Sequence, residues 1–196
     1  MFELPTNKEY VIAPLSLAIL STVLMLFSLG YYLDFDRTAI ANGEVWRVLT
    51  GQFTHSNWYH LLLNILGIVF IWLLHAEYTT IKKYWVNVGL LGAFTGLTIW
   101  FFAPNIVVYT GLSGLLHGLI VWGALEDIKR KLTTGYLLLI GVWAKVLWEQ
   151  YAGASADVAM LIDSRVAIEA HLFGAIGGVL LAIIYSTKQK SQLRPS

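Results

Sequence analysis

Long apolar stretches alternate with short polar connections along the whole chain. A helix that crosses a bilayer needs about 20 mainly apolar residues. Five stretches meet or approach that length, and a sixth, the fourth in order, is too short to cross alone. The six are 11–31, 58–75, 84–103, 112–126, 132–151 and 166–186. Irregular backbone must complete the fourth crossing, and at membrane depth such backbone is tolerated only inside protein or beside a wet cavity. The pattern predicts an all-α polytopic membrane protein, a six-helix bundle forming one domain over residues 1–196.

The composition supports a membrane protein. The chain is 57% hydrophobic and 13% charged, with a mean hydropathy of +0.66, whereas soluble domains are about 45–50% apolar and about a quarter charged. A net charge of +1 without a basic cluster argues against nucleic acid as a partner. The absence of cysteine excludes disulfides, thiolate metal sites and cysteine nucleophiles. We therefore expect the lipid bilayer to be the principal environment.

The distribution of lysine and arginine among the connections predicts the orientation. Nine fall on one side of the predicted membrane region: Lys8, Lys82, Lys83, Lys129, Arg130, Lys131, Lys188, Lys190 and Arg194. Four fall on or near the other side: Arg37, Arg47, Lys145 and Arg165. Because basic residues favour the cytoplasm, both termini are predicted to be cytoplasmic. No A-x-A-like site follows the first apolar run, which predicts a retained helix, and the long outer connection 32–57 is expected to have its own structure.

Polar side chains recur at one predicted depth. Ionisable and strong hydrogen-bonding groups inside a span are costly and are therefore candidate site residues. At a rise of about 1.5 Å per residue, Ser113, Asn64 and His171 all lie about 10 Å below the outer surface. His60 shares a helix face with Asn64, and His117 shares one with Ser113. Ser113 also begins a helix, where free N–H groups can stabilise an oxyanion.

Glycines accompany the serine and the histidine. Gly111, Gly114 and Gly118 surround Ser113, while Gly174 and Gly178 follow the histidine segment at positions i+3 and i+7. Small residues at such spacing let two membrane helices approach closely. Two glycine-faced helices can therefore bring a serine and a histidine within hydrogen-bonding reach.

Each residue also has a purely structural interpretation. A membrane serine often bonds its own backbone, glycines at this spacing often serve packing, and an asparagine can link two helices. His60 can be an interfacial histidine, as we expect for His75 at its cytoplasmic helix end. Lys145 and Glu149, at positions i and i+4, are expected to form a structural ion pair.

These residues resemble the motifs of the rhomboid family of intramembrane serine proteases. Residues 111–114 (Gly-Leu-Ser-Gly) resemble the family's nucleophile motif, and 170–174 (Ala-His-Leu-Phe-Gly) its histidine motif. His55 with residues 60–64 (His-Leu-Leu-Leu-Asn), and Trp46-Arg47, resemble the second-helix and first-loop patterns. The resemblance implies Ser113 and His171 as a catalytic dyad, and His60 and Asn64 in the oxyanion hole. It implies neither a cofactor nor a metal.

One residue differs from the common rhomboid pattern, and the difference resembles a particular subfamily. Rhomboids commonly carry a tyrosine four residues after the serine, packed on the catalytic histidine, where this chain has His117. We favour a packing role for His117 over proton exchange. The run 111–118 on a bare six-helix chain resembles the rhombosortase subfamily. That resemblance implies a bacterial inner membrane, a site open to the periplasm, and a membrane-anchored protein substrate with a C-terminal Gly-Gly, apolar and basic tail.

Two other functions stay open at this point. His55, His60, His117 and His171 can gather in a metal or ion transporter, although no acidic residue is expected in the site. The chain can also be an inactive rhomboid-like escort protein, although such proteins typically lack the serine or the histidine. We expect no carboxylate to orient His171, because Glu169 lies about 200° away around the same helix.

Overall fold

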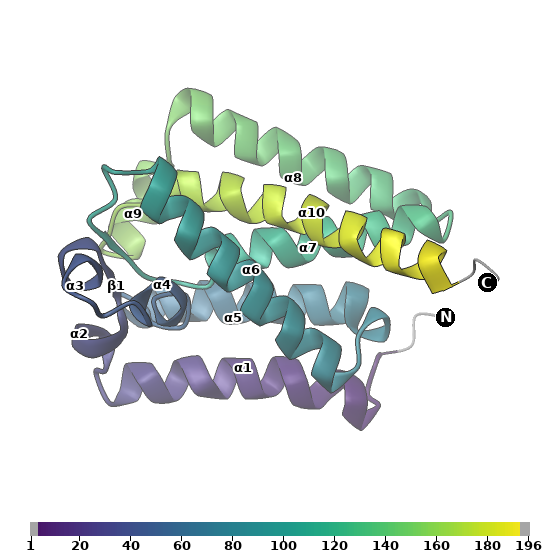
Figure 1. The fold of residues 1–196 in the computed structure, drawn as a ribbon, viewed down its shortest axis with the longest axis horizontal. Helices are drawn as coiled ribbons and strands as arrows, with labels where there is room; N and C mark the ends of the chain where they lie inside the picture. The colour runs from purple at the N-terminus through teal and green to yellow at the C-terminus, as the bar shows by residue number, and fades with distance from the viewer. Residues whose placement is uncertain (1–3, 193–196) are drawn as a thin grey trace.

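The chain folds into a bundle of long helices that run roughly alongside one another (Figure 1). This computed structural model describes the backbone of residues 4–192 and the side chains of residues 4–187. The longest helices it describes follow the predicted stretches in order: α1 (Lys8–Leu26), α5 (Trp58–His75), α6 (Ile81–Phe102), α7 (Ser113–Lys129), α8 (Thr133–Ala152) and α10 (Ile168–Gln192). The predicted all-helical membrane fold is thereby confirmed.

Within residues 4–192, four helical segments are long and apolar enough to cross a membrane: Lys8–Leu26, Trp58–Tyr78, Ile81–Phe102 and Ile168–Thr187. Helix α7 has 17 residues, and α8 carries Lys145 and Glu149, which lower its mean hydropathy. The count of six spans therefore stays a prediction.

The predicted end of the first span, near residue 31, was wrong. Helix α1 ends at Leu26, and a separate short helix, α2 (Gly30–Leu33), follows it. Ser28 has a φ of 52°, a left-handed conformation that interrupts an α-helix. The apolar run continues past the break, so hydrophobicity alone did not indicate where the helix ends.

The connection 32–57 has its own structure, as predicted. Besides α2, its elements are β1 (Phe35–Asp36), α3 (Arg37–Ala41) and α4 (Arg47–Thr50). Strand β1 pairs antiparallel with β2 (Val108–Tyr109), with Phe35 opposite Tyr109. The Arg37 guanidinium donates to four backbone carbonyls between Ile99 and Ile106, which satisfies the free carbonyl groups at the end of α6. Two further short elements are η1 (Ala76–Tyr78) and α9 (Ala156–Leu161).

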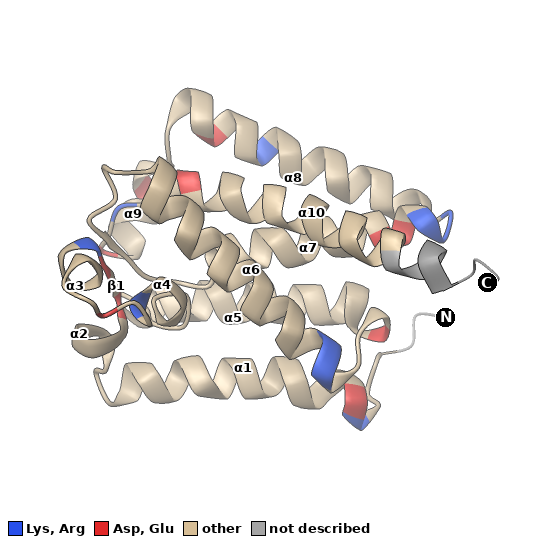
Figure 2. Ribbon diagram, viewed as in Figure 1, with Lys and Arg blue, Asp and Glu red and all other residues tan. Residues whose placement is uncertain are grey.

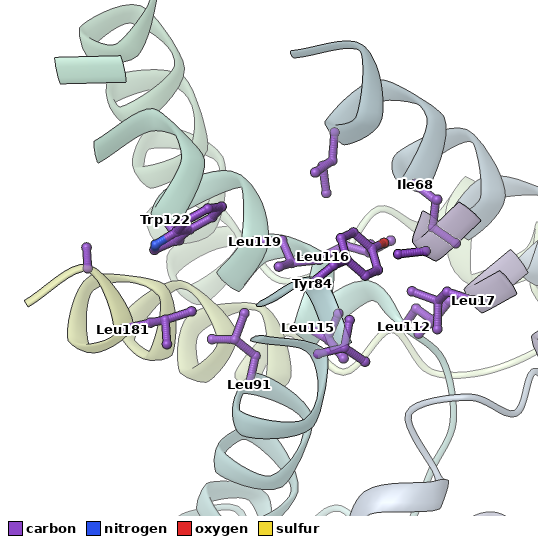
Figure 3. Packing of buried hydrophobic residues seen from close by; sticks show 14 residues of the cluster. Leu17, Ile68, Tyr84, Leu91, Leu112, Leu115, Leu116, Leu119, Trp122 and Leu181 are labelled. Atoms are coloured by element: carbon purple, nitrogen blue, oxygen red, sulfur yellow. The ribbon is translucent and has the colours of Figure 1, made fainter. Parts of the chain in front are cut away.

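Helix α7 lies in the centre of the bundle and packs most closely on α10. Leu115, Leu119 and Trp122 of α7 join Leu91 of α6 and Leu181 of α10 in one buried apolar cluster (Figure 3). The backbones meet where glycines face glycines. A Cβ atom on Gly174 would lie 1.8 Å from the Gly114 carbonyl oxygen, and one on Gly178 would lie 2.3 Å from that of Gly118. The predicted glycine-lined approach of these helices is confirmed.

The start of α1 and the end of α10 lie at the same end of the bundle (Figure 1). Basic residues gather at this end (Figure 2). They include Lys8 at the start of α1, Lys82 at the start of α6 and Arg130 in the α7–α8 turn. The side chains of Lys188 and Lys190, and all of Arg194, lie outside the described residues. The arrangement agrees with the charge pattern, while the orientation in a membrane stays a prediction.

His75 is not an interfacial residue. It is 2% exposed, and its Nε2 lies 3.4 Å from Asp127 on the neighbouring helix α7. The Tyr78 hydroxyl donates to the same carboxylate. The expectation failed because it rested on the position of His75 at a helix end, whereas α7 supplies a buried acidic partner there.

Candidate active site

Ser113 is the first residue of α7, directly after a constrained loop. Gly111 has a φ of +111°, which side-chain-bearing residues rarely adopt. Its N–H donates to the Gly51 carbonyl at 3.1 Å, and its own carbonyl accepts the Tyr109 hydroxyl at 2.7 Å. Leu112 precedes the helix without a side-chain cap. The N–H groups of the first turn therefore have no capping side chain, and they lie next to the serine.

The close packing of α7 and α10 brings the predicted pair together. Ser113 Oγ lies 3.0 Å from His171 Nε2. The Gly114–Gly174 approach is one residue after the serine and three after the histidine, so it sets the helix separation at the level of the pair. His171 is 5% exposed. The geometry suits proton transfer from the hydroxyl to the imidazole.

Asn64 and His60 of α5 face the loop that precedes Ser113. A Cβ atom on Gly111 would lie 2.5 Å from His60 Nε2 and 3.5 Å from Asn64 Nδ2. Among the described residues, Asn64 Nδ2 has no hydrogen-bond partner although the side chain is buried. A buried amide without a partner is costly. Asn64 therefore presents a free donor beside the serine.

The hydrogen bonds of His60 restrict its role. Ser56 Oγ donates to the Ile162 carbonyl at 2.6 Å and lies 3.0 Å from His60 Nδ1. Since a hydroxyl has one proton, Nδ1 must be the donor in the second contact. Nε2 of a neutral His60 is then an acceptor, so His60 can donate to an oxyanion only when Nε2 is also protonated.

An apolar cavity of about 380 Å³ opens onto these side chains. Its polar part contains Ser113, His171, Asn64, His60, His117 and Lys145. Its apolar walls come from α5, α7 and α8, and include Leu63, Phe70, Ile120 and Val142. The serine therefore faces a largely apolar space.

A carboxylate does contact His171, contrary to the sequence-based expectation. Glu149 Oε2 lies 2.8 Å from His171 Nδ1. The predicted Lys145–Glu149 ion pair is confirmed, with Nζ 2.8 Å from Oε1, and it leaves Oε2 for the histidine. Glu169 instead pairs with Arg165 at 2.7 Å. The expectation failed because it considered only the helix of His171, whereas Glu149 belongs to α8.

His117 stacks on His171 and has a partner at each ring nitrogen. Nδ1 lies 2.7 Å from the Ser113 carbonyl oxygen, and Nε2 lies 3.1 Å from Lys145 Nζ. A carbonyl only accepts and an ammonium only donates, so Nδ1 carries the proton and Nε2 is an acceptor. His117 occupies the position predicted for it beside the histidine.

The structure does not bring together the four histidines expected for a transporter, namely His55, His60, His117 and His171, among the residues it describes. Within the described part of the chain, the side chains with potential ligand atoms within 4.8 Å of one another are His117, Glu149 and His171. The Lys145 ammonium lies among them. His55 instead packs edge-on against His60, with ring centroids 5.0 Å apart. Burial and, to a smaller extent, the neighbouring His60 lower the pKa of His55 to about 3.

Two buried residues behind the serine, Tyr109 and Gln52, were not predicted from the sequence. The Tyr109 hydroxyl bonds to the Gly111 carbonyl and lies 3.4 Å from Gln52 Oε1. Burial raises the pKa of the Tyr109 phenol, so this group stays protonated. In the sequence, Tyr109 cannot be distinguished from an aromatic residue at the membrane interface. Only the folded chain places Tyr109 beneath the loop that precedes Ser113.

The fold and the site are a polytopic helical bundle that holds a half-buried serine against a buried histidine. Comparison with known proteins supplies the family. Residues 42–188 match the model of the rhomboid domain. The chain belongs to the rhomboid family, as its motifs predicted.

Three curated relatives are each 27% identical to the chain. They are the putative rhomboid protease YdcA of Bacillus subtilis (161 residues; 77% of this chain, 72% of the relative), the chloroplastic rhomboid-like protein 11 of Arabidopsis thaliana (154 residues; 74% and 54%) and the rhomboid-like protease 5 of Toxoplasma gondii (155 residues; 74% and 17%). The chain thus spans less than two thirds of two of these relatives.

Proposed function

We propose that the chain is an intramembrane serine protease whose nucleophile is Ser113 and whose general base is His171. The observation that carries the proposal is the 3.0 Å contact between Ser113 Oγ and His171 Nε2 beside an apolar cavity. Membership in the rhomboid family supports it. Two of the relatives are named as a protease and a putative protease, which agrees with this proposal.

The reaction follows from the two contacting atoms. Ser113 Oγ attacks a peptide carbonyl carbon while its proton passes to His171 Nε2. The tetrahedral intermediate collapses, the C–N bond breaks, and Nε2–H protonates the leaving amine. Water then attacks the acyl-enzyme carbonyl carbon and gives one proton to Nε2. The second tetrahedral intermediate collapses, the C–O bond to Ser113 breaks, and Nε2–H returns its proton to Ser113 Oγ as the carboxyl product leaves.

The oxyanion is stabilised by donors that are already in place. Asn64 Nδ2 is buried and free to donate, and the N–H groups at the start of α7 point their dipoles at the same region. His60 adds a donor only when its Nε2 is protonated. Gly111 and Gly114 keep the loop and helix close enough for these groups to converge.

We propose a membrane-anchored protein as the substrate. A site below the membrane surface accepts an extended segment that has left its own helix, and glycines favour that conformation. The His117 departure supports a rhombosortase-like specificity, namely a C-terminal Gly-Gly, apolar and basic tail. We place the chain, as a single domain of six spans, in a bacterial inner membrane with both termini cytoplasmic and the site open to the periplasm.

Labelling by a fluorophosphonate, which reacts with activated serines, tests the catalytic pair. Purified protein in lipid vesicles should be labelled at Ser113, and Ser113→Ala and His171→Ala should each abolish labelling without unfolding the protein. Combining them should add little, because residues that act as a unit are non-additive. EDTA should leave labelling intact, whereas a metal transporter should not be labelled at Ser113 at all. Unchanged labelling of the His171→Ala protein would reject the pair, and a folded wild-type protein that is not labelled at Ser113 would favour the escort function.

Mass spectrometry tests the substrate class. A secreted client with a Gly-Gly, apolar and basic tail should have a mature C-terminus beside the Gly-Gly only in cells that contain active Ser113. An intact tail in both strains rejects the rhombosortase-like specificity and leaves the serine protease proposal to the labelling experiment.

A further inference from the structure

Glu149 of α8 completes a chain of contacts that passes through both nitrogens of His171. Oε2 lies 2.8 Å from Nδ1, and Ser113 Oγ lies 3.0 Å from Nε2. The three groups come from α8, α10 and α7, so no local sequence motif places them together. We infer that Glu149 is a positioning residue that turns the serine–histidine dyad into a Ser113–His171–Glu149 triad, an inference that rests on the proposed function.

The contacts determine which ring nitrogen carries the proton. A carboxylate only accepts, so the 2.8 Å contact requires a proton on His171 Nδ1. Nε2 then has its lone pair directed at the Ser113 hydroxyl, which is the tautomer that a general base needs. The imidazolium formed during the reaction also gains an adjacent negative charge.

The Lys145 ammonium supports the ionised form of Glu149. Nζ lies 2.8 Å from Oε1, the oxygen that does not face the histidine. Lys145 Nζ also lies 3.5 Å from His171 Nδ1. When Nδ1 carries a proton, both of these atoms are donors, so they form no hydrogen bond with each other. With the carboxylate removed, this ammonium becomes the nearest partner of Nδ1 and favours the opposite tautomer, in which Nε2 carries the proton and cannot act as a base.

Burial separates the carboxylate–imidazole contact from an ordinary surface ion pair. The side chains of His171 and Glu149 are 7% and 14% exposed, whereas that of Lys145 is 49% exposed. Shielding from water strengthens the buried contact, while an exposed ion pair contributes little. The carboxylate should therefore matter far more than the lysine.

Four variants in lipid vesicles test this role by the rate of fluorophosphonate labelling. Glu149→Gln should lower the maximal labelling rate by up to about 10⁴-fold, the loss in kcat when the aspartate of a serine protease triad is replaced by asparagine, with little change in probe affinity. Glu149→Asp should retain part of the rate because it keeps a carboxylate. Lys145→Met should lose at most about fivefold. Glu169→Gln is the matched control, since Glu169 pairs with Arg165, and it should label like the wild type.

A spectroscopic measurement separates positioning from mere structural support. The ¹⁵N NMR shifts of His171 report which nitrogen carries the proton; they should show Nδ1–H in the wild type and a shift towards Nε2–H in Glu149→Gln. If Glu149→Gln labels within fivefold of the wild type, or loses rate only as much as Lys145→Met with an unchanged tautomer, the inference is overturned. In either case the loss of labelling in Ser113→Ala and His171→Ala would still support the proposed function.

Discussion

The imidazole of His117 lies nearly parallel to that of His171, with ring centroids 4.2 Å apart and an angle of 18° between the planes. His117 is also held at both nitrogens, by the Ser113 carbonyl at 2.7 Å and by Lys145 at 3.1 Å. Neither partner is the reacting hydroxyl. The stack therefore supports a packing role, in which the ring of His117 keeps the ring of His171 in place.

We predict that His117→Tyr retains measurable activity. A phenol ring preserves the aromatic contact and loses the two hydrogen bonds, each worth about 0.5–1.5 kcal/mol, so the labelling rate should fall by about tenfold. His117→Ala removes the ring and should be slower than His117→Tyr. A folded His117→Tyr protein without any labelling would instead identify His117 as an essential proton carrier.

Asn64→Ala should act on catalysis rather than on stability. Loss of one oxyanion donor lowers turnover by roughly 10²–10³-fold, and Asn64 Nδ2 has no partner within the described chain whose loss would destabilise the fold. Turnover of a cleaved client, with thermal unfolding measured alongside, checks this expectation.

Asn57→Ala, at the N-cap of the same helix, provides the contrast. Asn57 Oδ1 accepts from the His60 N–H at 2.8 Å and caps α5, so its loss should cost about 1 kcal/mol of stability and little turnover. If Asn64→Ala instead lowered the unfolding temperature and left turnover intact, Asn64 would be a structural link between helices.

Gly174→Ala should impair both folding and activity. The added Cβ atom would lie 1.8 Å from the Gly114 carbonyl oxygen, so α7 and α10 must separate at the level of Ser113 and His171. We expect a loss of about 1–3 kcal/mol in stability and at least tenfold slower labelling, because the pair depends on that separation.

Gly141→Ala is the control for the glycine prediction. Among the described residues nothing lies within 4 Å of a Cβ atom at Gly141 on α8, so the change should be neutral or stabilise the helix by up to about 1 kcal/mol. Equal effects of the two changes on unfolding and labelling would show that the close approach of α7 and α10 is not what positions the pair.

His55 should make the protein less stable in acid. Its pKa is about 3 in the fold against the usual 6.5, so the unfolded chain binds a proton that the folded chain does not. This contribution to stability is complete above pH 6.5 and is lost as the pH falls towards 3, by about 1.4 kcal/mol for each pH unit in that window. His55→Gln should reduce the difference between unfolding free energies at pH 7.5 and pH 5. An unchanged difference would mean that His55 is not buried in its neutral form.

Much of the site could be predicted from the sequence because its signals are local. Apolar runs of bilayer length predict helices. Counting residues from the ends of these runs predicts one depth for Ser113, Asn64 and His171, because the rise per residue is constant. Glycines at helical spacing predict a close approach, which the Gly114–Gly174 contact confirms. The motifs around Ser113 and His171 predict the family, which the match over residues 42–188 confirms.

The tertiary structure decided which side chains complete the site. Glu149 already had a local partner in Lys145, so the sequence had no reason to assign its second oxygen to His171 on another helix. Ser28 in the left-handed conformation ended α1 within an apolar run, and His75 found Asp127 instead of the interface. In each case the outcome depended on how helices distant in sequence are rotated and packed against one another. Long apolar runs indicate where membrane helices form, whereas packing between helices sets which of their polar atoms meet.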